Sequence, residues 1–188
     1  RIQRIVLSTV TIVSEAFQKR IARDKGNIIL SHKTMIPIKN KYKSPKTLGN
    51  DRLAAVIAAN ELYPKANVLV IDAGTCVKYD LINKKGEYFG GTISPGMQMK
   101  LDAMHSFTAK LPQFKASKYD GLFGRNTKES MLTGAQMATL LEMEGFIKRY
   151  SEKYDHLKVI LTGGDSNYFA KRLKRKIFVH PNLVLVGL

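Results

Sequence analysis

An acidic and a basic side chain stand next to each other at Asp51 and Arg52, at the start of the apolar stretch Leu53–Leu62. Such a pair at the beginning of a helix has two complementary uses. A carboxylate can take the proton from a substrate hydroxyl, and a guanidinium can bind an anionic group of the same substrate. An aspartate in this place can also cap the helix, and the two roles can coexist.

A second segment, Asp72-Ala-Gly-Thr75, follows the apolar run Val68–Ile71. This pattern predicts a buried strand that ends in a tight turn. Gly74 lets the backbone approach a ligand closely, Thr75 offers a hydroxyl, and Asp72 can hold a cation. The arrangement suits a phosphate, although a strand followed by a polar turn explains it equally well. With the first segment, it indicates phosphoryl transfer to a small hydroxyl acid.

The composition is strongly basic. The 188 residues carry 31 Lys and Arg against 15 Asp and Glu, a net charge of +16. The excess gathers in residues 1–50 and 171–176. Such clusters can bind nucleic acid, but few aromatic residues lie among them, so a solvated basic face is the simpler interpretation. Cys76 is the single cysteine, which excludes an intramolecular disulfide. The longest apolar run, Leu53–Ala59, is too short to span a bilayer, and we expect a cytoplasmic protein.

Hydrophobic periodicity predicts strands that alternate with helices, which is typical of the α/β class. Strands are expected at Ile5–Val10, Ile28–Leu30, Val68–Ile71, Cys76–Ile82, Glu87–Gly90, Val159–Thr162, Ile177–Val179 and Leu183–Val186. Helices are expected from an N-cap at Ser14 to Gly26, at Leu53–Leu62, around Met97–Met104, at Thr127–Tyr154 and at Tyr168–Leu173. A hairpin turn is predicted at Asn83–Gly86 and a lysine-rich surface loop at Met35–Pro45.

The order of several segments resembles the type III pantothenate kinases of the actin-like kinase superfamily. The matching segments are Tyr42–Arg52, Val70–Thr75, Gly90–Gly96, Thr108–Pro112, Gly124–Thr127 and Leu161–Asp165. The first is similar to the family's pantothenate-side signature, the second to its second phosphate motif, and the last to its adenosine-side motif. The resemblance extends from residue 42 to residue 165.

The resemblance implies a fold and an activity. The expected fold is the actin-like ATPase (ribonuclease-H-like) type, with two similar domains of which the first is incomplete. Residues 1–50 are the remainder of the N-terminal domain and 51–188 the C-terminal domain. The implied activity is the ATP-dependent phosphorylation of pantothenate to 4′-phosphopantothenate, the first step of coenzyme A biosynthesis. The alternative is a non-catalytic regulator that keeps the kinase fold and binds nucleic acid through its basic face.

The family's site residues map onto positions of this sequence. Asp51 is the implied general base. The implied pantothenate-binding residues are Tyr42, Gly49, Asn50, Asp51, Arg52 and Thr127. For ATP they are Gly74, Thr75, Gly163 and Gly164, and Asp72 is the implied ligand of a monovalent cation, K⁺ or NH₄⁺. For Thr127 a helix N-cap, and for Gly163–Gly164 an ordinary turn, are the alternatives. The implied cofactors are ATP, Mg²⁺ and the monovalent cation.

A homodimer is also implied, with an interface around Gly90–Gly96 and the apolar face of Met97, Leu101 and Met104 that completes the pantothenate pocket. Alternatively, these methionines fill the core of one chain.

Two departures from the family pattern stand out. The family's first phosphate motif, Asp-x-Gly-Asn-Thr-x-x-Lys, has no match, so we expect a fragment that lacks the first hairpin and is inactive by itself. A natural homologue without that hairpin is the alternative. Lys78 stands where the family usually carries a small residue such as Thr.

Overall fold

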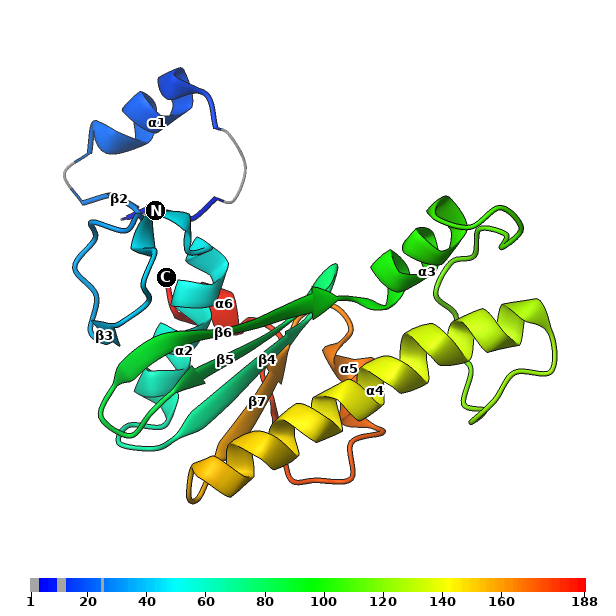
Figure 1. Cartoon of the computed structure of the whole chain (residues 1–188). Coiled ribbons are helices and arrows are strands. Elements are labelled where there is room, and N and C mark those ends of the chain that lie inside the picture. The colour runs from blue at the N-terminus through cyan, green and yellow to red at the C-terminus, as the bar shows by residue number, and fades with distance from the viewer. Residues whose placement is uncertain (1–3, 10–12, 25) are drawn as a thin grey trace. The chain divides into compact units, whose positions relative to one another are not determined.

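The computed structural model describes residues 4–9, 13–24 and 26–188 of the chain. It is a mixed α/β structure in which six strands form one sheet in the order β3-β6-β5-β4-β7-β8 (Figure 1). A further pair of short strands, β1 (Val6–Leu7) and β2 (Ile28–Ile29), runs parallel. In the part of the chain that the structure describes, none of the helices is both long and apolar enough to cross a membrane.

Three consecutive strands form the middle of the sheet: β4 (Val68–Ala73), β5 (Cys76–Ile82) and β6 (Glu87–Pro95). The first is an apolar run buried along most of its length, as expected of a central strand. The predicted turn at 83–86 connects β5 to β6, and the Asn83 side chain accepts hydrogen bonds from the backbone N–H groups of Lys85 and Glu87. Gly86, with φ of 69°, completes this turn.

The chain divides into two compact units. Unit 1 comprises Arg1–Val68, Asp80–Gly90 and Asn182–Leu188, and unit 2 comprises Leu69–Tyr79 and Gly91–Pro181. This division by contacts does not follow the predicted boundary between residues 50 and 51, because residues 51–68, 80–90 and 182–188 belong to unit 1. The assignment of residues 1–50 and 51–188 to two ribonuclease-H-like domains remains a prediction.

Unit 1 is built around α2 (Asn50–Leu62), whose side chains are mostly buried. It packs against the C-terminal helix α6 (Leu183–Val186), where Leu183 is fully buried. The unit also contains α1 (Glu15–Ala22), the 3₁₀ turn η1 (Pro45–Thr47) and β3 (Lys39–Asn40). The predicted cap of α1 is confirmed, since Ser14 Oγ accepts a hydrogen bond from the Phe17 backbone N–H.

Unit 2 is dominated by α4 (Thr127–Lys153), the long yellow helix of Figure 1. Its inner side packs against α3 (Met97–Ser106), with Leu101, Met131, Leu132 and Ala135 at the centre of the contact. The remaining elements are β7 (Lys158–Thr162), α5 (Ser166–Ala170) and β8 (Phe178–Val179), which pairs in parallel with β7.

Two element predictions need correction. Residues Leu183–Val186 form the helix α6 and not a strand, because this apolar run buries Leu183 against α2 instead of joining the sheet. The predicted loop at Met35–Pro45 contains the two-residue strand β3, which pairs with β6. The strand expected at Ile5–Val10 is β1, and Val10 lies outside the described residues.

Candidate active site

Within unit 1, the acid–base segment at the start of α2 includes a buried ion pair. Arg52 projects from the first turns of α2, and its Nε and Nη2 atoms donate to the carboxylate of Asp80 on β5, with Nη2 2.6 Å from Oδ1. The two side chains are only 5% and 3% exposed. The hydroxyl of Tyr88 on β6 also donates to Asp80, at 2.8 Å. This network fixes the direction of the guanidinium with a bidentate pair.

Burial and charge act on the protonation of this network in opposite directions. Burial by itself would lower the pKa of the Arg52 guanidinium, but the hydrogen bonds and charge of Asp80 outweigh it, so the pKa is raised. The pKa of the Tyr88 hydroxyl is raised by burial and by the adjacent Asp80 charge. Arg52 therefore stays cationic, and Tyr88 stays protonated as a donor.

Tyr42 covers this network. The Arg52 guanidinium carbon lies 5.6 Å from the centre of the Tyr42 ring, a cation–π contact, and the ring stacks on Tyr88 at 6.3 Å. Gly90 lies against the same ring: with φ of 115°, it could carry no Cβ without coming 2.7 Å from Tyr42. The structure thus brings Tyr42 and Arg52 together, as their shared predicted role requires.

Asp51, Asn50 and Gly49 form the start of α2. The N-cap is Gly49, so the capping role considered for Asp51 is not the one observed; its Oδ1 accepts a hydrogen bond from the Arg52 backbone N–H at 2.9 Å. The Asn50 amide donates to the carbonyl of Leu30 at 3.0 Å. Gly49 and Asn50 line a hollow of about 430 Å³ together with residues 30–32 and 45–48. A space of this size accommodates a small polar molecule.

Within unit 2, the phosphate motif and the glycine motif meet through backbone contacts. The N–H of Asp165 donates to the carbonyl of Ala73 at 2.9 Å. Gly163 has φ of 89°, and a Cβ there would lie 2.3 Å from the Ala73 carbonyl and 2.5 Å from Asp72 Oδ1. Only glycine permits this approach. By contrast, a Cβ on Gly164 or Gly74 would meet no atom within 4 Å, so both face open space.

The segment Gly90–Gly96 also reaches the phosphate motif. The Gly96 N–H donates to the Thr75 carbonyl at 3.0 Å, and a Cβ on Gly96 would lie 2.0 Å from the Gly74 carbonyl. The Gly74 N–H is bonded to the Cys76 carbonyl, whereas the Thr75 side chain is exposed. Three motifs that are widely separated in the sequence therefore converge on one turn.

Asp72, the predicted ligand of a monovalent cation, is bound to another side chain. The ammonium group of Lys78 lies 2.9 Å from Asp72 Oδ2. The other carboxylate oxygen, Oδ1, packs close to Gly163. An ion at Asp72 would therefore have to compete with Lys78, and the residues present do not fit an open monovalent-cation site. Among the described residues no three His, Cys, Asp or Glu side chains group as metal ligands.

Thr127 is the first residue of α4 and is exposed. The cap of this helix is Asn126, whose Oδ1 accepts a hydrogen bond from the Glu129 N–H at 3.0 Å, so the N-cap alternative considered for Thr127 does not apply. The Glu129 carboxylate in turn accepts from the Arg125 N–H at 2.8 Å. This bond lowers the pKa of Glu129 despite the opposing effect of burial.

A polar cluster around Glu142 was not predicted from the sequence. Glu142 on α4 accepts hydrogen bonds from the Tyr79 hydroxyl at 2.8 Å and from Ser94 Oγ at 2.9 Å. Lys100 on α3 donates to Glu142 and to Thr139, at 3.2 and 2.7 Å. Burial and the hydrogen bond to Glu142 raise the pKa of Tyr79. The cluster ties two strands and two helices together beside the Gly90–Gly96 segment.

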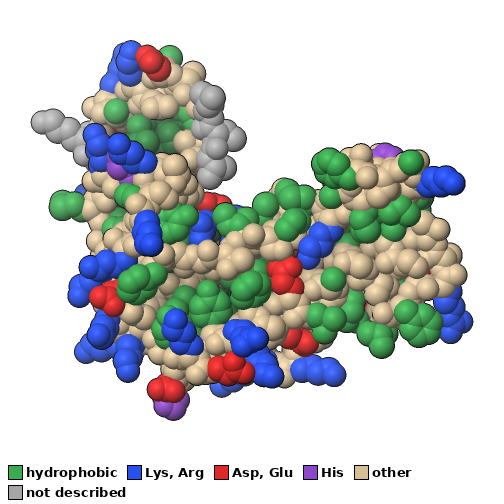
Figure 2. Space-filling view, viewed as in Figure 1, with side chains coloured by type: hydrophobic (Ala, Val, Ile, Leu, Met, Phe, Trp, Pro, Cys, Tyr) green, Lys and Arg blue, Asp and Glu red, His purple; other side chains and the backbone are tan. Residues whose placement is uncertain are grey.

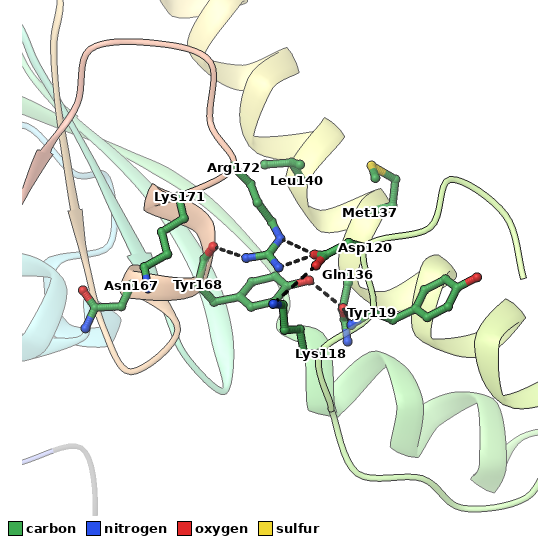
Figure 3. Close-up of a pocket in the computed structure, with 10 residues that line it drawn as sticks. All are labelled: Lys118, Tyr119, Asp120, Gln136, Met137, Leu140, Asn167, Tyr168, Lys171 and Arg172. Atoms are coloured by element: carbon green, nitrogen blue, oxygen red, sulfur yellow. Dashed lines mark hydrogen bonds and ion pairs between the residues drawn. The ribbon is translucent and has the colours of Figure 1, made fainter.

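A second hollow, of about 710 Å³, lies between α5, α4 and the segment before α4 (Figure 3). Arg172 stacks on the Tyr168 ring at 3.7 Å and pairs with Asp120. The Tyr168 hydroxyl donates to Gln136, whose amide donates to the Ser117 carbonyl. The side chains that line this hollow therefore bond to one another. The helix α5 on one side of it begins two residues after Gly164.

The comparison with known proteins decides the family. The family model described as "Type III pantothenate kinase" matches residues 2–149. The chain belongs to the type III pantothenate kinase family. It is 45% identical to the type III pantothenate kinase of Phocaeicola vulgatus over all of this chain and 78% of that protein. It is 40% identical to the type III pantothenate kinase of Christiangramia forsetii, over all of this chain and 77% of that protein. The predicted actin-like α/β fold is confirmed.

A solved structure also resembles this member of the family. It is a conserved protein of Campylobacter jejuni described as a Baf family transcriptional activator, with a TM-score of 0.63 and 21% identity over all of this chain and 80% of that one. At this identity the likeness shows the fold alone. Figure 2 shows Lys and Arg side chains spread over the face in view, with acidic side chains between them. The kinase family, and not the nucleic-acid alternative, is the interpretation that the comparisons favour.

Proposed function

We propose that the function of this protein is the ATP-dependent phosphorylation of pantothenate to 4′-phosphopantothenate, the first step of coenzyme A biosynthesis. Membership of the type III pantothenate kinase family supports this activity. The observation that carries it is the convergence of Gly96 and Gly163 on the turn Asp72–Thr75 through backbone contacts. Such a turn, with open space beside Gly74 and an exposed Thr75 hydroxyl, offers phosphate a place to bind.

Asp51 acts as the general base in this proposal. Phosphoryl transfer passes through a loose transition state, so the base mainly orients the attacking hydroxyl and accepts its proton late. Asp51 lies at the beginning of a helix, one residue before Arg52, whose backbone N–H donates to its Oδ1. The hollow beside Gly49 and Asn50 supplies the adjacent space for substrate.

In this proposal Arg52 binds the pantothenate carboxylate with only one of its three guanidinium nitrogens. Nε and Nη2 donate to Asp80, so this role falls to Nη1, on a guanidinium whose orientation Asp80 sets. The Tyr42 ring lies over the same guanidinium. Thr127, exposed at the start of α4, provides a hydroxyl for the substrate.

Mg²⁺ accompanies ATP in this proposal. Magnesium is usually held by one or two carboxylates together with the phosphates of the nucleotide, so it requires no dedicated group of protein ligands. It neutralises charge on the transferred phosphoryl group. Thr75 and Gly74 on one side, and Gly163 and Gly164 on the other, are the proposed contacts of ATP.

A homodimer and a cytoplasmic location complete the proposal. Met97 and Leu101 are buried, and Met104 packs against the same core. This face of α3 is therefore part of the core of unit 2. The exposed side chains of Ile93 on β6 and Leu141 on α4 are the better candidates for an interface. Light scattering of wild type and Leu141→Lys tests this, since a charge within the interface lowers the measured mass.

A coupled assay of ADP release tests the activity. Protein that also carries the family's first phosphate motif is expected to turn over with Mg²⁺-ATP and pantothenate, whereas residues 1–188 alone are expected to be inactive. In the active protein, Asp51→Asn is expected to reduce kcat by about 10²–10⁴-fold because the base is lost. Asp24→Asn, a matched change at an exposed aspartate, is expected to leave the rate unchanged. Undiminished turnover in Asp51→Asn would remove Asp51 from the mechanism. A protein that binds ATP but never phosphorylates pantothenate would overturn the proposed function.

A further inference from the structure

The ion pair between Lys78 and Asp72 lies at the turn Asp72–Thr75 and is partly buried. Lys78 lies on β5 and Asp72 near the end of the neighbouring strand β4, with Nζ 2.9 Å from Oδ2. The side chains are 21% and 18% exposed. Attraction between such partly buried charges is screened much less than between charges in open solvent.

Asp72 is held on its other side as well. Its Oδ1 lies close to Gly163, at the point where the glycine motif crosses the end of β4. The next residue, Ala73, accepts the hydrogen bond from the Asp165 N–H. The carboxylate is therefore part of the same junction as the turn that is proposed to receive phosphate, and the Lys78 ammonium is its ion-pair partner there.

A lysine side chain is chemically well suited to supply that cation. Its ε-ammonium is a compact single charge with three donors, in effect an ammonium ion attached to the chain. Because it is tethered next to Asp72, a free ion would compete against a partner at high effective concentration. Lys78 therefore offers at Asp72 the same charge as K⁺ or NH₄⁺, without a binding equilibrium.

We propose that the Lys78 ammonium is a built-in monovalent cation for Asp72, so that this protein needs neither K⁺ nor NH₄⁺ at that carboxylate. The part concerning catalysis rests on the proposed kinase function. The part concerning ion binding does not, because it is a property of the Asp72 site itself and is measurable without substrate.

Thermal unfolding in matched salts tests the ion-binding part. Wild type is expected to have the same Tm in KCl and in choline chloride of equal ionic strength. Lys78→Thr opens space at Asp72, and its Tm is expected to rise saturably in KCl over choline, by about 2–4 °C. Lys85→Thr, an exposed lysine in the β5–β6 turn, serves as the matched control and is expected to behave as wild type.

A second substitution at the same position separates the charge of Lys78 from its bulk. Lys78→Met retains the aliphatic stem that blocks access to Asp72, and is expected to lose stability without gaining a response to K⁺. A saturable KCl effect on wild type would overturn the proposal, and this arm requires no variant to fold. The absence of a KCl effect on folded Lys78→Thr would overturn it as well.

Kinase assays supply the second arm. Wild-type turnover is expected to stay unchanged when KCl replaces choline chloride, whereas Lys78→Thr turnover is expected to rise several-fold with KCl. Wild-type turnover that depends on K⁺ would overturn the proposal. These assays use protein that also carries the family's first phosphate motif. No turnover of that protein in any salt, together with the expected Tm pattern, would reject the kinase function and support the built-in cation.

Discussion

Removal of the Asp80 charge should destabilise unit 1 strongly, because it leaves the Arg52 guanidinium buried without its counter-ion. The two side chains are 5% and 3% exposed, and the Tyr42 ring lies over the Arg52 guanidinium. Asp80→Asn retains the shape of the side chain and one carbonyl acceptor. It also deprives the Tyr88 hydroxyl of its charged acceptor. The substitution thus tests charge at nearly constant volume.

The expected loss can be bounded. Breaking a buried ion pair from one side costs about 3–5 kcal/mol, and the retained amide oxygen places Asp80→Asn near the lower value, about 3 kcal/mol. For a chain of this length, that corresponds to a fall in Tm of about 6–12 °C. The exposed pair Lys19–Glu15, with side chains 77% and 88% exposed, provides the comparison. Glu15→Gln should cost less than about 0.5 kcal/mol.

Urea unfolding provides the measurement. The chain contains no tryptophan, so tyrosine fluorescence and far-UV circular dichroism are the two probes, and coincident transitions establish that two-state values apply. The double variant Arg52→Met with Asp80→Leu replaces the pair by apolar side chains and should regain most of the lost stability. A loss below about 1 kcal/mol in Asp80→Asn, or a double variant as unstable as the single one, would refute the reasoning.

Four further substitutions probe other parts of the chain. Gly187→Ala should lower the free energy of unfolding in urea by about 1–3 kcal/mol, since its Cβ would lie 1.9 Å from the Ala54 carbonyl. Gly134→Ala is the control, because a Cβ there meets open space, and it should be neutral or stabilising. Equal effects of the two substitutions would contradict this reasoning. Gly96→Ala should raise the KM for ATP by displacing the phosphate turn, and an unchanged KM would argue against that site. Glu129 has a lowered folded-state pKa, so its stabilisation is present above its unfolded pKa near 4.5 and is lost as the pH falls through the folded value. The urea midpoints of wild type and Glu129→Gln should therefore differ at pH 7 and converge as the pH falls through the folded-state pKa; a difference independent of pH would rule this out.

The sequence predicted the middle of the sheet and the long helix well, because their signals are local. Val68–Ile71 is a continuous apolar run, the Asn83–Gly86 turn has its expected chemistry, and α4 spans residues 127–153 almost as predicted. The strand expected at Leu183–Val186 was wrong. A run of four apolar residues does not distinguish a strand from a helix, and contact with α2 decides the outcome.

The partners of the site residues could not be found in the same way. Asp80 is 28 positions from Arg52, and no local pattern joins them. The available signal was a lone aspartate within the apolar stretch Tyr79–Ile82, which requires a cation when buried. The partners of Glu142 and Lys78 could not be predicted from a local pattern either, because each partner lies on another element or on a neighbouring strand. The roles of the site residues toward substrate remain predictions.

The two short edge strands give the basic composition a further consequence. Both borders of the six-stranded sheet are formed by strands of only two residues, β3 and β8. A short edge exposes few backbone groups to which another chain could add a strand, and lysine at an edge opposes such pairing through charge. Lys39 and Lys41 lie at one border, and Lys174 and Lys176 precede the other. Part of the +16 charge thus opposes edge-to-edge pairing of the sheet with another chain. This effect does not depend on any ligand.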